Sequence, residues 1–199
     1  PRAKAATLPA ASTAAGGSGH VVIVLLDATD ADACAAIVSD LPPLFGLVNN
    51  AGFGLTGAVE DVSDDDAHRL FETMVHAPMR LTRLVLPAMI EAGGGRIVNV
   101  SSIAGRTSSP LAGHYTAAKH ALEALSDALR VEVASRGVQV ALVEPGGFKT
   151  NIWQDMEGDI AAHESSGSRF TASYRRSMAG QRLIEPLMGN PSQCAKVIV

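Results

Sequence analysis

The segment RIVNVSSIAGRTSSPLAGHYTAAKHALEAL, residues 96–125, decides the fold of this chain. It begins with a short apolar run, RIVNV, which predicts a buried strand. The polar pair Ser101 and Ser102 follows directly. A helical pattern then runs from about Gly113 to Ser135, and Arg136-Gly137 ends it with a basic residue and a glycine. A buried strand that leads into a long helix is typical of an alternating β/α fold.

The same alternation occurs along the rest of the chain. Further buried strands are predicted at 21–26, in LFGLVNNAG at 44–52 and in VQVALVEPGG at 138–147, each with its exit turn. Helices are predicted at Asp30–Ser39, capped by Thr29 or Asp30, and from Ser63 to about Ala92, with a kink near Pro78 and a stop at GGG 93–95. Four alternations predict an α/β fold with a doubly wound parallel sheet in three layers.

The two ends of the chain give weaker patterns. AKAATLPAAS, near the start, resembles the tail of a helix. Beyond Thr150 the pattern becomes irregular, and PSQCAKVIV at 191–199 looks like the start of another helix. We therefore expect irregular structure between Thr150 and the helix that starts at Pro191.

A polar or glycine-rich motif follows every predicted strand: DATD at 27–30, NNAG at 49–52, NVSS at 99–102 and EPGG at 144–147. The carboxyl ends of parallel strands meet at one edge of the sheet, and ligands bind there. Each motif alone is also compatible with an ordinary turn. Their repeated position predicts a binding site at this edge.

Tyr115 and Lys119 are four residues apart, so a helix places them on the same face. A nearby ammonium favours the phenolate and lowers a phenol pKa from about 10, as a general acid/base requires. Ser102 could hold a carbonyl or alkoxide oxygen. A chance pair on a helix surface and a capping role for Ser102 are the alternatives, and the strand-end placement favours the catalytic interpretation.

Together, NNAG, RIVNVSS, the Ser102/Tyr115/Lys119 spacing and VEPGGFKTN resemble the short-chain dehydrogenase/reductase family over roughly residues 20–152. NNAGFGLTG and VEPG are similar to members that act on steroids and retinoids. The resemblance implies a Rossmann-type fold and an NAD- or NADP-dependent enzyme that interconverts an apolar alcohol and a ketone or aldehyde. Tyr115 would be the acid/base, Lys119 would lower its pKa and bind the nicotinamide ribose, and Ser102 would orient the substrate oxygen.

The resemblance also implies the rest of the site. Asp27 would lie by the adenine, Asn49, Ala51 and Gly52 along the adenosine, and Pro145, Gly146, Gly147 and Thr150 near the nicotinamide. Residues 151–190 would be the variable substrate loop of a single, incomplete domain spanning 1–199, with Trp153, Met156, Phe170 and Tyr174 forming either an apolar lid or a mobile surface segment. The helices near 64–91 and 113–135 would form the interface of a homodimer or homotetramer.

Two features depart from the family pattern. Met74 stands where the family usually carries an Asn that holds a water in a proton relay from the lysine, so we expect reduced activity. The glycine-rich TGxxxGxG loop and the first two strands are not found in the 199 residues, and the last strand is also lacking. We therefore expect the chain as given to be inactive and the full gene product to be active. The alternative is a non-catalytic fragment or binding scaffold with impaired cofactor binding.

Composition narrows the classes further. The net charge is −4 and no basic run occurs, which argues against nucleic-acid partners. Cys34 and Cys194 have no metal-ligand spacing, so no metal site is predicted and a reducing, cytoplasmic location is expected. No apolar run reaches about 18 residues, so no transmembrane segment is predicted.

Overall fold

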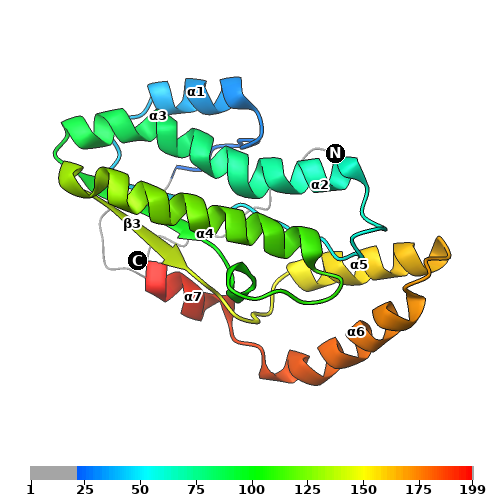
Figure 1. Cartoon of the computed structure of the whole chain (residues 1–199). Helices are drawn as coiled ribbons and strands as arrows, with labels where there is room; N and C mark the ends of the chain where they lie inside the picture. Colours follow the sequence, from blue (N-terminus) through cyan, green and yellow to red (C-terminus); the bar gives the residue numbers. More distant parts are fainter. Residues whose placement is uncertain (1–21, 199) are drawn as a thin grey trace.

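A computed structural model of the chain describes residues 22–198 (Figure 1). Three parallel strands form one sheet in the order β1-β2-β3: β1 is Gly46–Asn49, β2 is Gly95–Val100 and β3 is Val138–Val143. The register places Asn49 of β1 opposite Asn99 of β2. The predicted α/β class and the parallel sheet are confirmed, whereas the helix tail expected in AKAATLPAAS lies outside the described residues.

Helices connect and flank these strands. In chain order they are α1 Ala31–Ser39, α2 Asp64–Phe71, the π-helical segment η2 Glu72–His76, α3 Ala77–Glu91, the 3₁₀ turn η3 Ile103–Gly105, α4 Gly113–Val133, the 3₁₀ turn η4 Ala134–Arg136, α5 Ile152–Ser165, α6 Thr171–Ile184, the 3₁₀ turn η5 Glu185–Leu187 and α7 Pro191–Ile198. The helices predicted at Asp30–Ser39, from Ser63 and at Gly113–Ser135 are confirmed, and α7 confirms the helix predicted at the end of the chain.

Side-chain caps explain where two helices begin. The Asp30 carboxylate accepts a hydrogen bond from the Ala33 N–H at 2.9 Å, and the Ser63 hydroxyl accepts one from the Asp66 N–H at 3.1 Å. Both bonds satisfy N–H groups of a first helical turn, which has no partner inside the helix. The helix starts predicted at Asp30 and Ser63 are therefore confirmed, and the capping bonds explain them.

The break expected near Pro78 occurs as a π-helical segment. Pro78 has no N–H, so an α-helical bond to the Met74 carbonyl cannot form. The helix widens over Glu72–His76, and the Ala77 N–H donates to the Glu72 carbonyl. Single π turns inside longer helices often occur at functional sites, and this one contains Met74.

The helices α3 and α4 cover one face of the sheet (Figure 1). The buried core between them consists of Val85, Met89, Ile97, Val133, Val138 and Val140. Burial alternates along β2 and β3, as the strand period of two requires. Side chains of the opposite parity, Val48 and Ala141 among them, are exposed within the described structure. The packed face therefore determines how α4 lies on β2.

The strand predicted at 21–26 is wrong for the described residues 22–26, which have no regular secondary structure and lie outside the sheet. Val22 is 80% exposed and Leu25 is 75% exposed. A strand needs a hydrogen-bonded neighbour, and β1 pairs with β2. The apolar run predicted burial, but no described strand lies beside this segment to provide it.

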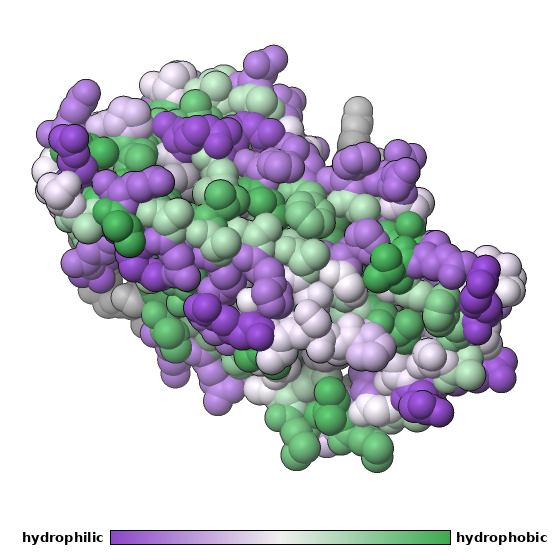
Figure 2. Space-filling view, in the orientation of Figure 1, coloured by the Kyte–Doolittle hydropathy of each residue, from purple (hydrophilic) through white to green (hydrophobic). Residues whose placement is uncertain are grey.

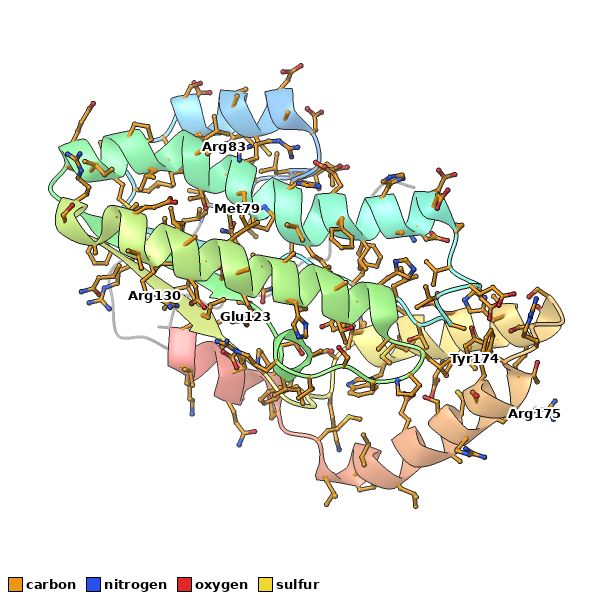
Figure 3. The ribbon with its side chains drawn as sticks, in the orientation of Figure 1. Met79, Arg83, Glu123, Arg130, Tyr174 and Arg175 are labelled. Atoms are coloured by element: carbon orange, nitrogen blue, oxygen red, sulfur yellow. The ribbon has the colours of Figure 1, made fainter. Side chains whose placement is uncertain are left out.

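The irregular structure expected beyond Thr150 is also wrong, because α5 and α6 form there. A polar cluster fastens this helical pair to the loop after β1. The buried Tyr174 hydroxyl donates to the Asp61 carboxylate at 2.7 Å and accepts from the Ala58 N–H at 2.7 Å, and the Ser168 hydroxyl donates to Asp61 at 2.6 Å (Figure 3). The partners lie more than 100 residues apart in sequence, so local composition could not indicate them.

The α5–α6 pair presents a mixed surface. Apolar side chains gather at the lower edge of the face shown in Figure 2. Leu183 of α6 is 78% exposed and Leu187 of η5 is 83% exposed. Tyr174, in contrast, is fully buried. Tyr174 therefore supports the α5–α6 pair from within and does not line an apolar lid.

A chain of buried hydrogen bonds joins β1, β2 and α4. The Asn49 amide donates to the Asn99 side-chain oxygen at 2.8 Å, the Asn99 amide donates to the Ser126 hydroxyl at 2.8 Å, and Ser126 donates to the Leu122 carbonyl at 2.6 Å. Asn99 and Ser126 are fully buried. Each polar group satisfies the next, which offsets its loss of contact with water.

Replacing Asn99 with Ala is expected to lower the free energy of unfolding by about 2–3 kcal/mol, because the buried Asn49 amide and Ser126 hydroxyl lose their partner. Urea unfolding followed by circular dichroism measures the loss. The control is Gln139→Ala on the exposed side of β3, expected to change stability by less than about 0.5 kcal/mol. Equal losses in the two variants would contradict the role assigned to the Asn99 bonds.

Candidate functional site

The turn after β2 places Ser102 at the carboxyl edge of the sheet. Ser102 caps η3, with extended backbone and a hydroxyl that accepts from the Ala104 N–H at 3.1 Å. The Ser101 N–H donates to the Val143 carbonyl at 2.7 Å and the Ile103 N–H donates to the Pro145 carbonyl at 3.0 Å. These bonds tie the Ser102 turn to the exit of β3. The capping role is thus present, and it holds Ser102 at the expected place.

The helix α4 brings Tyr115 and Lys119 to the same edge. The Lys119 Nζ donates to the Val100 carbonyl, the last residue of β2, at 2.8 Å. The same Nζ lies 5.9 Å from the centre of the Tyr115 ring. Tyr115 is half-buried against the apolar cluster that contains Met74. The structure therefore brings Tyr115, Lys119 and the Ser102 turn together, as the spacing predicted.

Burial controls the protonation of the pair. Burial raises the pKa of the Tyr115 phenol above its ordinary value, and the neighbouring Ser102 hydroxyl opposes this rise. Burial lowers the pKa of Lys119 to about 8, and the negative charge of Glu123 acts in the opposite direction. The expected lowering of the Tyr115 pKa by Lys119 is not seen, because loss of hydration has the largest effect and the opposing effect comes from the Ser102 hydroxyl. At neutral pH the Tyr115 phenol is therefore protonated, and it lies beside a lysine whose pKa is close to neutral.

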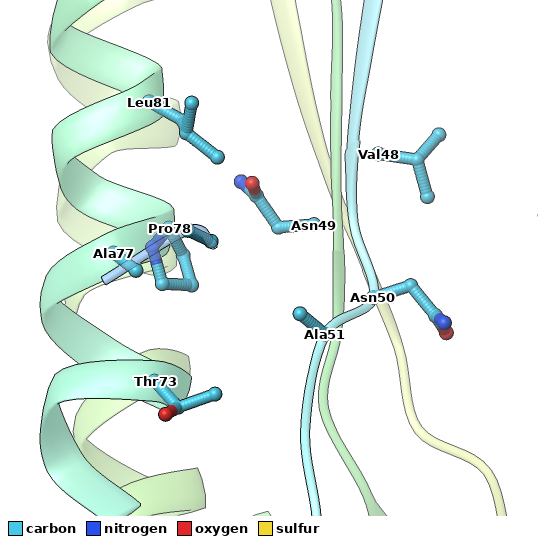
Figure 4. A pocket seen from close by; sticks show the side chains of 9 residues that line it. Val48, Asn49, Asn50, Ala51, Thr73, Ala77, Pro78 and Leu81 are labelled. Atoms are coloured by element: carbon cyan, nitrogen blue, oxygen red, sulfur yellow. The ribbon is translucent and has the colours of Figure 1, made fainter. Parts of the chain in front are cut away.

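A shallow cavity of about 70 Å³ opens beside the end of β1 (Figure 4). Its lining residues are Ala28, Val48, Asn49, Asn50, Ala51, Thr73, Ala77, Pro78 and Leu81. The Asn49 side chain points toward the helix and bonds Asn99. Ala51 and Gly52 are exposed at the edge. The adenosine-side residues expected at NNAG thus lie at this edge, but the Asn49 amide is committed to the sheet.

Asp27 lies at the surface in the turn before α1. Its carboxylate accepts hydrogen bonds from the Thr29 hydroxyl at 2.7 Å and the Thr29 N–H at 2.9 Å, and these bonds lower its pKa. The adjacent Ala28 carbonyl accepts from Arg80 of α3 at 3.1 Å. Sequence reasoning missed Arg80, which holds the DATD turn beside the cavity.

The exit of β3 is open to solvent at Gly146, Gly147 and Thr150. The Gly147 carbonyl accepts from the Gly189 N–H at 3.0 Å, and the Trp153 indole donates to the Phe148 carbonyl at 2.7 Å. These bonds connect the PGG loop to the segment before α7 and to α5. The residues expected on the nicotinamide side therefore flank the same edge as Ser102.

Met74 occupies an apolar environment at the back of the site. It is 2% exposed and belongs to a cluster with Leu55, Leu70, Val75 and Ala118. Its methyl group also limits the space at Gly52, where an added Cβ would lie 3.3 Å from the Met74 Cε. The part of the site formed by η2 is therefore apolar around Met74.

Two searches of the described residues were negative. No group of three or more His, Cys, Asp or Glu side chains lies close enough to hold a metal ion within residues 22–198. None of the helices in that range combines the length and apolar character needed to cross a membrane. Both cysteines of the chain are free, Cys34 in the interior and Cys194 partly exposed.

A parallel sheet with a serine turn, a tyrosine and a buried lysine at its carboxyl edge defines the class of Rossmann-type oxidoreductases. Comparison with known proteins gives the family. Residues 2–161 match the family model described as short chain dehydrogenase. The chain belongs to the short-chain dehydrogenase/reductase family.

Individual relatives agree with this assignment. The uncharacterized oxidoreductase YusZ of Bacillus subtilis is 35% identical over 91% of this chain and 66% of the relative. A short-chain dehydrogenase from Streptomyces avermitilis is 42% identical, with a TM-score of 0.62 over 65% of this chain and 49% of that one. A metagenomic short-chain oxidoreductase in complex with NADP is 34% identical, with a TM-score of 0.58 over 60% of this chain and 56% of that one. The chain spans about half to two thirds of the length of these relatives.

The low pKa of Lys119 predicts a specific pH dependence of stability. Between about 8 in the folded state and the ordinary 10.5, the unfolded chain holds the lysine proton and the native chain does not, so the free energy of unfolding rises with pH in this window. The shift corresponds to roughly 3 kcal/mol. Lys119→Met is expected to lack this rise.

Urea unfolding of both proteins at pH 7, 8.5 and 10 checks the prediction. The quantity of interest is the difference in unfolding free energy between wild type and variant, since all other titrating groups are shared. A difference that stays constant from pH 7 to 10 would contradict the burial cost assigned to Lys119.

Proposed function

We propose that this chain forms part of an NAD(P)-dependent oxidoreductase that interconverts an alcohol and a ketone or aldehyde. The observation that carries the proposal is the convergence of Ser102, Tyr115 and Lys119 at the carboxyl edge of β2, with Lys119 fixed to the Val100 carbonyl at 2.8 Å. Membership of the short-chain dehydrogenase/reductase family and the NADP complex of a relative support it.

The residues at the edge fit the nicotinamide half of such a cofactor. Lys119 uses one of its three donors on Val100, so two remain for ribose hydroxyls. Gly146 and Gly147 are exposed at the exit of β3, and an added Cβ at Gly146 would meet no atom within 4 Å. When bound, NAD or NADP supplies or accepts the hydride. On the adenosine side, the exposed Asp27, Ala51 and Gly52 would hold the other half.

Each catalytic side chain has a role that follows from its surroundings. The raised pKa keeps Tyr115 protonated at neutral pH, so its phenol would donate a proton to a carbonyl oxygen. Ser102 would donate a hydrogen bond to the same oxygen and orient it. Lys119 would return a proton to the tyrosine, which a pKa of about 8 allows near neutral pH.

The substrate is proposed to be apolar. Gly54, in the loop after NNAG, lies directly against α5: a Cβ there would fall 3.1 Å from side-chain atoms of both Ile152 and Met156. Phe53 and Tyr115 are both half-buried and pack against the same apolar cluster. The apolar side chains beside Gly54, together with Phe53, favour an apolar alcohol or ketone.

A non-catalytic binding scaffold is the second candidate. The observation that favours it is Met74, which places a buried apolar side chain where the family usually has a relay amide. A binding scaffold has no chemical need for a buried lysine, whereas an enzyme of this kind needs one. The effect of removing the Tyr115 hydroxyl on turnover therefore separates the two candidates.

Tyr115→Phe in the full-length gene product is expected to lower kcat by about 10²–10⁴-fold, because the proton donor is lost while the ring packing remains. Oxidation of NADH or NADPH with a panel of apolar ketones measures the rate, and fluorescence titration measures cofactor binding, which should be retained. His120→Gln, an exposed change on the same helix, is the control and should keep the wild-type rate. Equal turnover by wild type and Tyr115→Phe would exclude the proposed acid/base role.

A further inference from the structure

A buried carboxylate lies one helical turn beyond Lys119. Glu123 of α4 is 4% exposed and points toward the turn after β2 (Figure 3). Neither of its oxygens accepts a hydrogen bond from the described residues. An unpaired carboxylate in the interior is strongly destabilising, so a buried one is expected to have positive charges as neighbours. The spacing of four residues from Lys119 is visible in the sequence, but the sequence does not show that Glu123 is buried.

Two positive groups supply this compensation. The Arg106 Nη2 lies 3.0 Å from the Glu123 Oε2 in an ion pair. Lys119 faces Glu123 on α4, and the negative charge of Glu123 partly offsets the effect of burial on the lysine pKa. The carboxylate is therefore held by charge from two different elements.

Arg106 extends the contact to the exit of β3. Its Nε and Nη2 groups donate to the Glu144 Oε1 at 3.1 and 3.0 Å. Arg106 follows directly after η3, the turn that Ser102 caps. The Glu123–Arg106–Glu144 clamp, as we name these three side chains, thus connects α4, the Ser102 turn and the strand end that leads to Pro145.

Gly105 allows the turn to lie this close to Glu123. A Cβ at Gly105 would fall 2.7 Å from the Ser101 hydroxyl oxygen, 2.8 Å from the Glu123 Cγ and 2.9 Å from its Oε1. The Ser101 hydroxyl is itself buried without a partner in the described structure. Glycine at this position is therefore a condition for close packing of the turn on the carboxylate.

We propose that Glu123 is a positioning residue, which through the clamp holds the Ser102 turn against α4 and keeps a negative charge facing Lys119. Its consequence for catalysis rests on the proposed function, whereas its effect on the lysine does not. Glu123 touches no reacting atom, so it is a positioning residue and not a catalytic residue.

The charged surroundings of Lys119 make the proposal testable. On its own helix it faces Tyr115 and Glu123. Arg106 lies on the η3 side and Glu144 on the β3 side. Toward η2 the neighbour is the uncharged Met74 cluster. Removing the charge of Glu123 should therefore lower the pKa of Lys119 and should not raise it.

The first experiment titrates Lys119 directly. ¹³C-lysine NMR of the protein follows the Cε resonance against pH, and Lys119→Met identifies the signal among those of Lys4, Lys149 and Lys196. In Glu123→Gln the Lys119 midpoint should fall below its wild-type value. Asp127→Asn, the same change in an exposed ion pair with Arg130 on the same helix, should leave it unchanged. A Glu123→Gln midpoint equal to wild type would overturn the electrostatic part of the proposal.

Arg106→Gln keeps the test decisive if Glu123→Gln does not fold, because Arg106 is 52% exposed. This variant leaves the Glu123 charge without its second cation. The Lys119 midpoint should then rise above the wild-type value, opposite to the Glu123→Gln result. An Arg106→Gln midpoint equal to or below the wild-type value would count against the clamp.

The second experiment measures the full-length enzyme with an apolar ketone. Glu123→Gln should lower kcat by about 10–100-fold, since small displacements of catalytic groups have effects of this size, with KM changed less than about threefold. The limb of the kcat profile that depends on Lys119 should move to lower pH, and Glu123→Asp should recover part of the rate. Unchanged kcat and an unmoved limb would overturn the positioning role. A wild-type enzyme without turnover would instead refute the proposed function, and the NMR result would still stand.

Discussion

The site depends on the way α4 is fixed to β2. Two buried polar contacts do this: Asn99 donates to Ser126, and Lys119 donates to the last carbonyl of β2, Val100. Both lie on the face that α3 and α4 cover, where burial alternates strictly along the strand. These two bonds fix the position of α4 along β2, and the Tyr115 phenol lies beside the turn that begins at Ser102. Apolar packing alone would bring α4 to the sheet, but it would not select one position along the strand.

The second constraint is the cost of burying charge. Lys119 is 5% exposed and Glu123 is 4% exposed, which is unusual for either residue type. A buried charge adds little stability compared with apolar packing, so the buried Lys119 and the buried Glu123, which pairs with Arg106, are better explained by what they position. Lys119 is held with a pKa of about 8, in the range where a proton can be both accepted and released near neutral pH. Burial of Lys119 thus makes the core at α4 less stable and at the same time lowers the pKa of the lysine.

Sequence reasoning succeeded where a local signal matched a local cause. The caps at Asp30 and Ser63, the helix break near Pro78 and the strands β2 and β3 are of this kind, and so is the meeting of Tyr115 with Lys119. It failed where partners were distant in sequence. The apolar run at 22–26 signalled burial that depends on a neighbouring strand, and α5 and α6 are fastened by the bonds of Tyr174 and Ser168 to Asp61. The site showed the same limit, because the spacing of Glu123 was readable but its burial and its contact with Arg106 were not.

Met74 and Glu123 mark an apolar side and a charged side of the site. On the η2 side of Lys119 the neighbours are apolar, with Met74 packed among Leu55, Leu70 and Val75. On the η3 side the neighbours are charged, and Arg106 extends from the buried Glu123 to the surface. A buried lysine can exchange protons with solvent only along polar groups, since apolar side chains offer neither donors nor acceptors. The charged neighbours therefore lie on the Glu123 side of α4, and the side that carries Met74 is apolar.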